Sequence, residues 1–296
     1  MGDCMSNRTF TLGIAAAALC VGTAVAPAMA ADVGGGLYYP PTLPSIENPI
    51  YAPTVQAHVD LYAGKAFFSE DDFSQNAGLF GGAGRINVPF RNGWNLQLDA
   101  QGSALLLHED DDSFSFPTEY SGFAHIYRMN PDSHALGVFG GASWFLGPQA
   151  YTIGVEGQMY WPHFTLYGQA SVAALRVDDE SSHAVQLRGQ GQWFATDNTA
   201  VMGDVIWTHI NEFGGSSGVS VLSLAGTLMH RFQGTAFAGF GKVRWDQFAF
   251  DGFSGSTTSV LGGVRVMTGQ PNATLKQHLR EVPMNVEPIL FGFPDA

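Results

Sequence analysis

The chain has 296 residues and a formal net charge of −13, with 37 Gly, 22 Phe and 6 Trp but only 13% charged residues. The negative charge argues against nucleic acid as a partner, because phosphates are bound by clustered Lys and Arg. The abundance of Gly and aromatic residues beside so few charges is unusual for a soluble domain.

The first thirty residues have the pattern of a secretory signal peptide. Arg8 precedes an apolar run of small residues at 10–26, and Ala28-Met29-Ala30 matches an A-x-A cleavage site. We therefore expect residues 1–30 to be removed, so that the mature chain begins near Ala31.

Both cysteines, Cys4 and Cys20, lie in this expected signal peptide. Cys20 follows Leu19, where a lipobox would need a small residue, and this argues against lipidation. The mature chain would therefore have no thiol, which excludes cysteine catalysis, disulfides and thiolate metal ligands.

Residues 31–54 form a Gly/Pro-rich segment that begins with Gly34-Gly35-Gly36 and continues through several prolines. Such a composition favours an extended chain over a helix or strand. We interpret it as a periplasmic leader that precedes the folded domain.

From residue 55 onward, apolar and polar residues alternate in segments that are separated by Gly, Asn, Asp and Pro. The clearest segment is 94–106, where Trp94, Leu96 and Leu98 alternate with polar residues such as Asn95. A period of two is typical of a β-strand whose two faces meet different surroundings.

The pattern predicts twelve strands of a length that suits a tilted membrane crossing. After the signal peptide, no uninterrupted apolar run is long enough to cross a bilayer as a helix. We therefore predict an all-β fold, a transmembrane antiparallel up-and-down β-barrel over residues 55–268. The expected strands are 55–68, 76–89, 93–107, 117–128, 134–145, 150–161, 163–176, 183–195, 199–210, 217–231, 234–248 and 257–268.

The predicted connections alternate between short turns and longer segments that are acidic or rich in Gly and Ser. In outer-membrane barrels the short turns lie in the periplasm and the longer loops lie outside. An even number of strands then places both termini in the periplasm. The predicted outer connections are 70–72, 108–117, 147–149, 178–180, 212–218 and 251–256, of which 147–149 is short.

Aromatic residues fall near the predicted strand ends, where Trp and Tyr favour the two membrane interfaces. The alternative explanation is core packing in a soluble β-sandwich. The residues are Trp94, Trp144, Tyr160, Trp161, Trp193, Phe194, Trp207 and Trp245.

Residues 269–296 break the alternation, and 274–281 (TLKQHLRE) predicts a short helix in a C-terminal periplasmic tail. The chain ends in Pro294-Asp295-Ala296 rather than on a strand with a terminal aromatic residue. The strand recognised by the barrel-assembly machinery would then be internal, at 259–268. Whether the tail plugs the barrel or lies free stays open.

Seven segments resemble a family of alphaproteobacterial outer-membrane β-barrel proteins that are loosely called porin-like. They are 121–131 (SGFAHIYRMNP), 135–140 (ALGVFG), 154–161 (GVEGQMYW), 164–168 (FTLYG), 236–241 (AFAGFG), 261–266 (LGGVRV) and 274–281 (TLKQHLRE). The resemblance implies a barrel in the outer membrane of a Gram-negative cell, in contact with lipid and lipopolysaccharide. It supplies no catalytic residues.

If the apolar strand faces meet lipid, the opposite faces place a set of mixed charges in the lumen. These charges would either line a water-filled path or pair across the interior and close it, and both interpretations stay open. The candidate lumen residues are Asp60, Arg85, Asp99, Glu119, His125, Glu156, Arg188, Asp204, Lys242, Arg244, Asp246 and Arg265.

These observations favour a non-enzymatic protein, either a narrow channel for small hydrophilic solutes or a structural component of the envelope. A lipid hydrolase would use Ser181 and His183 as nucleophile and base, but no catalytic acid is recognisable. A third alternative is a surface-interaction protein that uses the acidic outer loops. We expect no cofactor and no metal, because 108–112 (HEDDD) lacks the spacing of a calcium loop. The oligomeric state is not predicted.

Overall fold

The fold is that of a computed structural model, which describes residues 54–70, 73–109, 112–145, 148–177, 180–211, 218–250, 253–268 and 273–282. The expected signal peptide, residues 31–53 of the leader and residues 283–296 lie outside the described residues.

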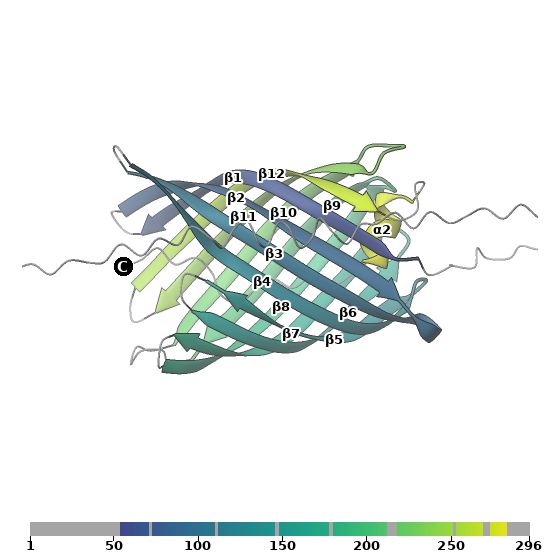
Figure 1. The fold of residues 1–296 in the computed structure, drawn as a ribbon, viewed down its shortest axis with the longest axis horizontal. Coiled ribbons are helices and arrows are strands. Elements are labelled where there is room, and N and C mark those ends of the chain that lie inside the picture. The colour runs from purple at the N-terminus through teal and green to yellow at the C-terminus, as the bar shows by residue number, and fades with distance from the viewer. Residues whose placement is uncertain are drawn as a thin grey trace, which may run out of the picture. The chain divides into compact units, whose positions relative to one another are not determined.

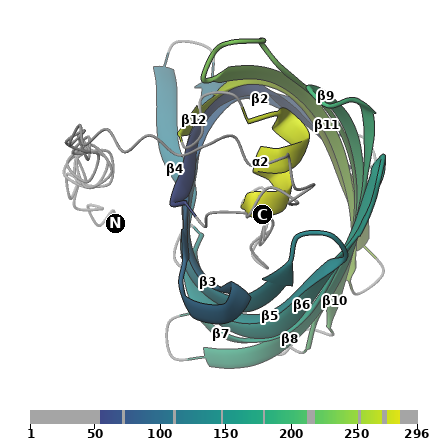
Figure 2. The same ribbon diagram turned by 90° about the vertical axis from the view of Figure 1, so that its right-hand side faces the viewer.

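The described residues form twelve antiparallel strands that close into a single barrel (Figures 1 and 2). Each strand pairs with its neighbours in sequence, and β1 closes the barrel by pairing with β12. The predicted up-and-down barrel is therefore confirmed, and the β-sandwich is not. The strands are β1 (Gln56–Glu70), β2 (Phe73–Pro89), β3 (Trp94–Glu109), β4 (Asp112–Asn130), β5 (His134–Trp144), β6 (Gln149–Trp161), β7 (Phe164–Val177), β8 (Glu180–Thr196), β9 (Thr199–Ile210), β10 (Val219–Arg231), β11 (Phe237–Phe250) and β12 (Phe253–Thr268).

The alternation in the sequence becomes an apolar outer face and a polar inner face. Leu136, Ile153 and Val155 are 62%, 66% and 58% exposed on the outside. Buried glutamines and charged residues fill the alternate positions, as Gln158 and Glu156 do in β6. This is the reverse of a soluble protein, and it is the distribution that a barrel surrounded by lipid requires.

The interfacial aromatic residues divide into two groups. Trp94, Trp161 and Trp193 are 41% to 53% exposed on the outer face. Tyr160 and Phe194, which we also expected at the interface, instead point into the barrel and are 6% and 1% exposed. Each directly precedes or follows an outward Trp, and a strand turns adjacent residues to opposite faces.

Several outer connections are shorter than the sequence predicts, because the strands continue through them. β1 pairs with β2 as far as Glu70 and Phe73, and β3 pairs with β4 as far as Glu109 and Asp112. The predicted loop 108–117 therefore belongs largely to these strands, and β12 likewise begins inside the predicted loop 251–256. Backbone hydrogen bonds extend an antiparallel hairpin irrespective of the polarity of its side chains.

The opposite end of the barrel has tight turns. Between β2 and β3 the chain forms a short 3₁₀ turn, η1 (Arg91–Gly93), in which Asn92 and Gly93 have φ of 61° and 78°. A Cβ on Gly93 would lie 2.8 Å from the carbonyl oxygen of Met129, so this position requires glycine.

The helix α2 (Leu275–Glu281) follows the last strand and lies within the barrel opening (Figures 1 and 2). It begins at a capping box, in which the Thr274 hydroxyl accepts from the Gln277 backbone N–H and the Gln277 side chain accepts from that of Thr274. In the described ranges, no helix is both long and apolar enough to span a membrane.

Candidate functional site

The twelve candidate lumen residues occupy inward-facing strand positions. Nine of them line a cavity of about 330 Å³ inside the barrel. Asp99, His125 and Glu156 belong to the ion pairs that continue from this lining along the wall. Their part in solute passage stays a prediction.

The cavity lies between two apolar groups of side chains. Phe68, Phe145 and Phe248 lie toward the strand ends that are remote from α2. Leu279 of α2 and its C-cap residue Val282 lie at the other end. The charged residues line the cavity between these groups. A polar chamber therefore occupies the barrel, with α2 at one of its ends.

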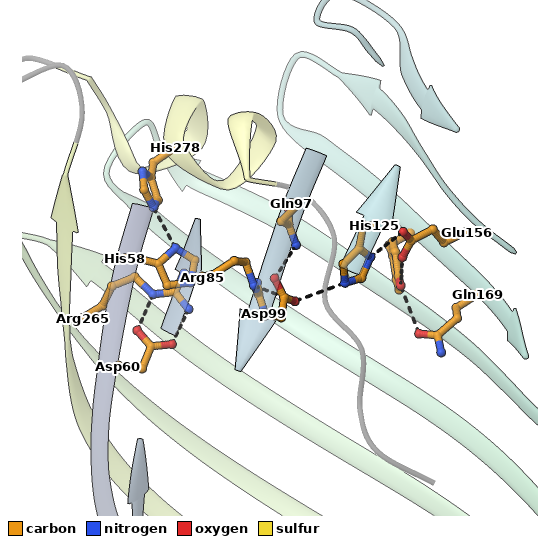
Figure 3. Close-up of polar contacts among 11 residues, drawn as sticks. His58, Asp60, Arg85, Gln97, Asp99, His125, Glu156, Gln169, Arg265 and His278 are labelled. Atoms are coloured by element: carbon orange, nitrogen blue, oxygen red, sulfur yellow. Dashed lines mark hydrogen bonds and ion pairs between the residues drawn. The ribbon is translucent and has the colours of Figure 1, made fainter. Parts of the chain in front are cut away.

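A chain of ion pairs follows the wall on one side of the chamber (Figure 3). Arg265 on β12 binds Asp60 on β1 through two hydrogen bonds of 2.7 and 2.6 Å. Arg85 on β2 pairs with Asp99 on β3 at 3.0 Å, and Asp99 lies 3.5 Å from His125 on β4. Asp99 thus lies between a basic group and an imidazole from the two neighbouring strands.

The chain of polar contacts continues past β5. His125 Nδ1 lies 2.7 Å from Glu156 Oε1, although β5 separates their strands. Gly137, the β5 partner of Glu156, faces inward between them. A Cβ at this position would lie 2.5 Å from the Cβ of Tyr127 and 2.9 Å from the carbonyl oxygen of Ile126, so the glycine allows β4 and β5 to approach closely here.

Polar contacts extend further around the wall. Tyr167 donates to Glu156 at 3.0 Å, and Gln169 donates to Gln186 at 3.3 Å. Arg188 on β8 donates to Asp204 on β9 through its Nε at 2.9 Å. On β11, the Nε of Arg244 donates to Asp246 at 2.8 Å, and the guanidinium also reaches Ser223 on β10.

These contacts bear on the two interpretations of the lumen charges. The ion pairs join side chains on the same strand, on adjacent strands or across β5, so they run along the wall. Pairing of this kind offsets the desolvation of charges in a confined space. A cavity of about 330 Å³ remains inside the barrel beside these pairs, and passage of solutes through it stays a prediction.

The helix α2 closes the chamber at the mouth through an apolar contact. Leu275 is fully buried and Leu279 is 8% exposed. Both pack in one cluster with barrel side chains that include Phe194, Met229 and Met267. These residues come from β8, β10 and β12, so the helix contacts several parts of the barrel wall. Phe194, which faces inward next to the outward Trp193, is buried by this cluster.

Polar contacts attach α2 around the rest of the mouth. Lys276 forms an ion pair with Asp197, and the Leu275 backbone N–H donates to Asn198 at 3.1 Å in the β8–β9 connection. On the opposite side, Asn87 of β2 donates to the carbonyl oxygen of Glu281 at 2.8 Å. The helix is therefore held at both of its ends.

Arg280 joins α2 to a third part of the rim. Its guanidinium donates to the carbonyl oxygen of Trp161 and lies 5.2 Å from the ring centre of Tyr160. A cation over an aromatic face is favourable where water is partly excluded. The inward-facing ring of Tyr160 thus helps to hold α2.

A buried pair of histidines joins α2 to β1. His58 Nδ1 lies 3.0 Å from His278 Nε2, and the two residues are 2% and 1% exposed (Figure 3). Burial, reinforced by the positive charges of Arg265, Arg231 and Arg85, lowers the pKa of His278 from 6.5 to about 3. The imidazole of His278 is therefore neutral while the helix is docked.

The sequence analysis assigned no role to His58 or His278. His58 lies two residues before Asp60 in β1, so strand alternation alone places it on the inner face. The position of His278 depends on how the tail folds back, and the sequence contains no signal for it.

Ser181 and His183, the alternative catalytic pair, lie on the outer face of β8 and are both exposed. They border a shallow depression with His209 and Asn211. In the part of the chain that the structure describes, no hydrogen bond joins Ser181 to His183, and no group of three or more His, Cys, Asp or Glu residues could hold a metal ion.

No known protein family and no curated protein matches this sequence. Solved outer-membrane barrels resemble its fold. An outer-membrane channel from Pseudomonas putida F1 has a TM-score of 0.51 at 8% identity and covers 77% of this chain and 100% of its own. The NanC porin has a TM-score of 0.49 at 8% identity, with coverages of 70% and 98%. The KdgM porin in complex with disordered oligogalacturonate has a TM-score of 0.41 at 10% identity, with coverages of 72% and 99%.

At these identities the similarity concerns the fold alone. This chain has the fold of an outer-membrane β-barrel. The residues of its chamber have to be interpreted from their own chemistry.

Proposed function

We propose that this protein is a channel for small hydrophilic solutes in the outer membrane of a Gram-negative bacterium, within the alphaproteobacterial porin-like family that its segments resemble. The observation that carries the proposal is a charged chamber of about 330 Å³ inside a barrel whose outer face is apolar. The apolar face favours lipid and lipopolysaccharide as surroundings, and the polar wall favours water and hydrated solutes.

The expected signal peptide and the strand order support the orientation that we propose. β1 begins and β12 ends at the same mouth of the barrel, where Ala57 pairs with Thr268. A chain exported through residues 1–30 and inserted by the barrel-assembly machinery would place this mouth, with α2, in the periplasm.

The chamber supports passage by diffusion more than catalysis. Its charged groups are engaged with one another along the wall, as Arg188 is with Asp204 and Arg265 with Asp60. Fixed charges of both signs favour small polar solutes over apolar ones. We therefore propose no enzymatic activity, and the exposed pair Ser181 and His183 carries no hydrolase proposal.

Planar-bilayer recording of the purified protein tests the proposal. We expect discrete conductance steps that are small at neutral pH, because α2 lies in the mouth, and larger when its docking is weakened by Leu275→Ala. The matched control is Leu136→Ala, which removes an equal side chain from the outer face, where Leu136 is 62% exposed. An absence of conductance from all three proteins, over a range of voltage and salt, would favour the structural envelope role instead.

A further inference from the structure

The contacts that hold α2 in the mouth are of two chemically different kinds. Its apolar side chains and its ion pair with Asp197 resemble ordinary packing, but the contact with β1 consists of two buried imidazoles. A structural anchor at this place needs no titratable group. Two side chains that hydrogen-bond but do not titrate, such as two amides, would hold the helix as well.

We propose that α2 is an acid-released gate, in which protonation of the His58–His278 pair undocks the helix and opens the mouth of the chamber. The inference rests on the proposed channel function and adds its regulation. It is carried by the position of the pair, between the helix that occupies the mouth and the wall that the helix covers (Figure 3).

The geometry of the pair tolerates at most one proton between the facing nitrogens. His58 Nδ1 and His278 Nε2 are 3.0 Å apart, so one must donate and the other must accept. When both rings are protonated, two N–H donors and two positive charges face each other. Separation of the rings relieves this repulsion and also returns the charges to water.

The groups around the pair do not offset added positive charge. Arg265 on β12, Arg85 on β2 and Arg231 on β10 act on His278 from the barrel side. The acidic groups nearest to these cations are already engaged, because Arg265 holds Asp60 and Arg85 holds Asp99.

On α2 itself, Lys276 and Arg280 add two further positive charges, and Glu281 adds one negative charge. The charges that act on His278 from the barrel are those of Arg265, Arg231 and Arg85, and all three are positive. This arrangement favours the neutral pair.

The sign of the effect follows from the shift at His278. Its pKa is about 3 in the docked state and returns toward 6.5 when the helix is exposed to water. Docking is therefore strongest above pH 6.5 and weakens as the pH falls toward 3. With these two pKa values, protonation of His278 alone reduces the docking equilibrium constant by about 30-fold between pH 8 and pH 5.

The helix is well suited to release. It has seven residues, and an isolated helix of this length is marginal in water. Once the histidine contact is broken, loss of docking and loss of helical structure reinforce each other. The barrel itself does not depend on α2 for closure, because β1 and β12 pair directly.

Conductance recordings of the full-length protein between pH 8 and pH 5 test the gate. We expect the wild-type conductance to rise as the pH falls. The double variant His58→Gln/His278→Gln should conduct at a level independent of pH over this range, because two amides can hydrogen-bond without titrating. His163→Gln is the matched control, since His163 is exposed in the β6–β7 connection, and it should retain the response.

A reversible tether gives the second measurement. The Lys276 backbone N–H donates to the Asp197 carbonyl oxygen at 3.0 Å, so the two backbones are close and Lys276→Cys/Asp197→Cys should form a disulfide that holds α2 in place. We expect the oxidised protein to stay in its low-conductance state at pH 5 and the reduced protein to recover the acid response. Each single-cysteine variant is a control, and heat-modifiable gel mobility shows that each barrel is folded.

Three outcomes would overturn the gate. They are a wild-type conductance that does not rise with acid, an acid response that persists in the double histidine variant, and an oxidised tether that opens fully at pH 5. In each of these the protein still conducts, so the channel proposal stands. If neither wild type nor Leu275→Ala conducts at any pH, the channel proposal fails together with the gate.

Discussion

Asp60 and Arg265 face each other across the seam that closes the barrel, joined by two hydrogen bonds of 2.7 and 2.6 Å. They are 205 positions apart in the sequence, and they are direct partners in the register of β1 with β12. Closure of the barrel thus places a buried acid opposite a buried base. The pair stabilises the one strand contact that sequence proximity does not favour.

Asp60→Asn should destabilise the barrel, because it leaves the Arg265 guanidinium buried without its carboxylate. Loss of one partner of a buried ion pair costs about 3–5 kcal/mol. Denaturant unfolding in detergent, followed by tryptophan fluorescence, measures the change. Asp132→Asn, in an exposed turn, is the control and should change stability by less than about 0.5 kcal/mol. Equal effects of the two substitutions would contradict a role for the seam pair.

Gly137→Ala should destabilise the barrel by disturbing the approach of β5 to β4. The added Cβ would lie 2.5 Å from the Tyr127 Cβ and 2.9 Å from the Ile126 carbonyl oxygen. Overpacking of this kind costs about 1–3 kcal/mol.

Gly168→Ala is the matched control for this substitution. Gly168 is exposed on the outside, and an added Cβ there meets no atom within 4 Å. The denaturation midpoint of the Gly137→Ala variant should fall, and that of the Gly168→Ala variant should stay at the wild-type value. A normal midpoint for Gly137→Ala would show that β5 shifts easily and that the glycine is not required.

Leu275→Ala should loosen α2 and leave the barrel intact. Leu275 is fully buried among barrel side chains, and truncation of a buried Leu costs about 2–5 kcal/mol. We expect faster proteolysis of the C-terminal segment at neutral pH, with unchanged heat-modifiable mobility. Protection equal to that of the wild type would show that the apolar cluster does not hold the helix.

Lys242→Gln/Arg244→Gln should shift the ion selectivity of the channel toward cations. Both side chains line the chamber on β11, and their removal lowers the local positive potential. Reversal potentials in a salt gradient measure the shift. Arg176→Gln removes a positive charge from the outside of β7, where the residue is exposed, and serves as the control. An unchanged reversal potential in the double variant would place the solute path elsewhere.

Acid should expose α2 to modification. Because the docked state lowers the pKa of His278 to about 3 from 6.5, docking stability is lost as the pH falls below 6.5. A cysteine introduced by Leu279→Cys should react with a soluble methanethiosulfonate reagent at a rate that rises as the pH falls toward 5, after correction for the pH dependence of thiolate reactivity. A corrected rate that is constant between pH 8 and pH 5 would contradict acid release.

The sequence by itself determined the number of strands, their order and the inner face. Side-chain alternation is a local property, so Asp99 and Glu156 could be assigned to the lumen from their neighbours alone. Strand ends were less predictable. Polar residues marked 108–117 as a loop, but the backbones of β3 and β4 pair through most of this segment whatever the polarity of its side chains.

The tertiary structure alone decided which charges meet and what closes the chamber. Asp60 meets Arg265 only when the barrel closes, and His58 meets His278 only when the tail returns to the mouth. Strand alternation turns Tyr160 and Phe194 inward, but only the folded tail brings Arg280 of α2 against both rings. Such contacts join residues far apart in the chain, and their free energy depends on burial and distance, which no local pattern of residues contains.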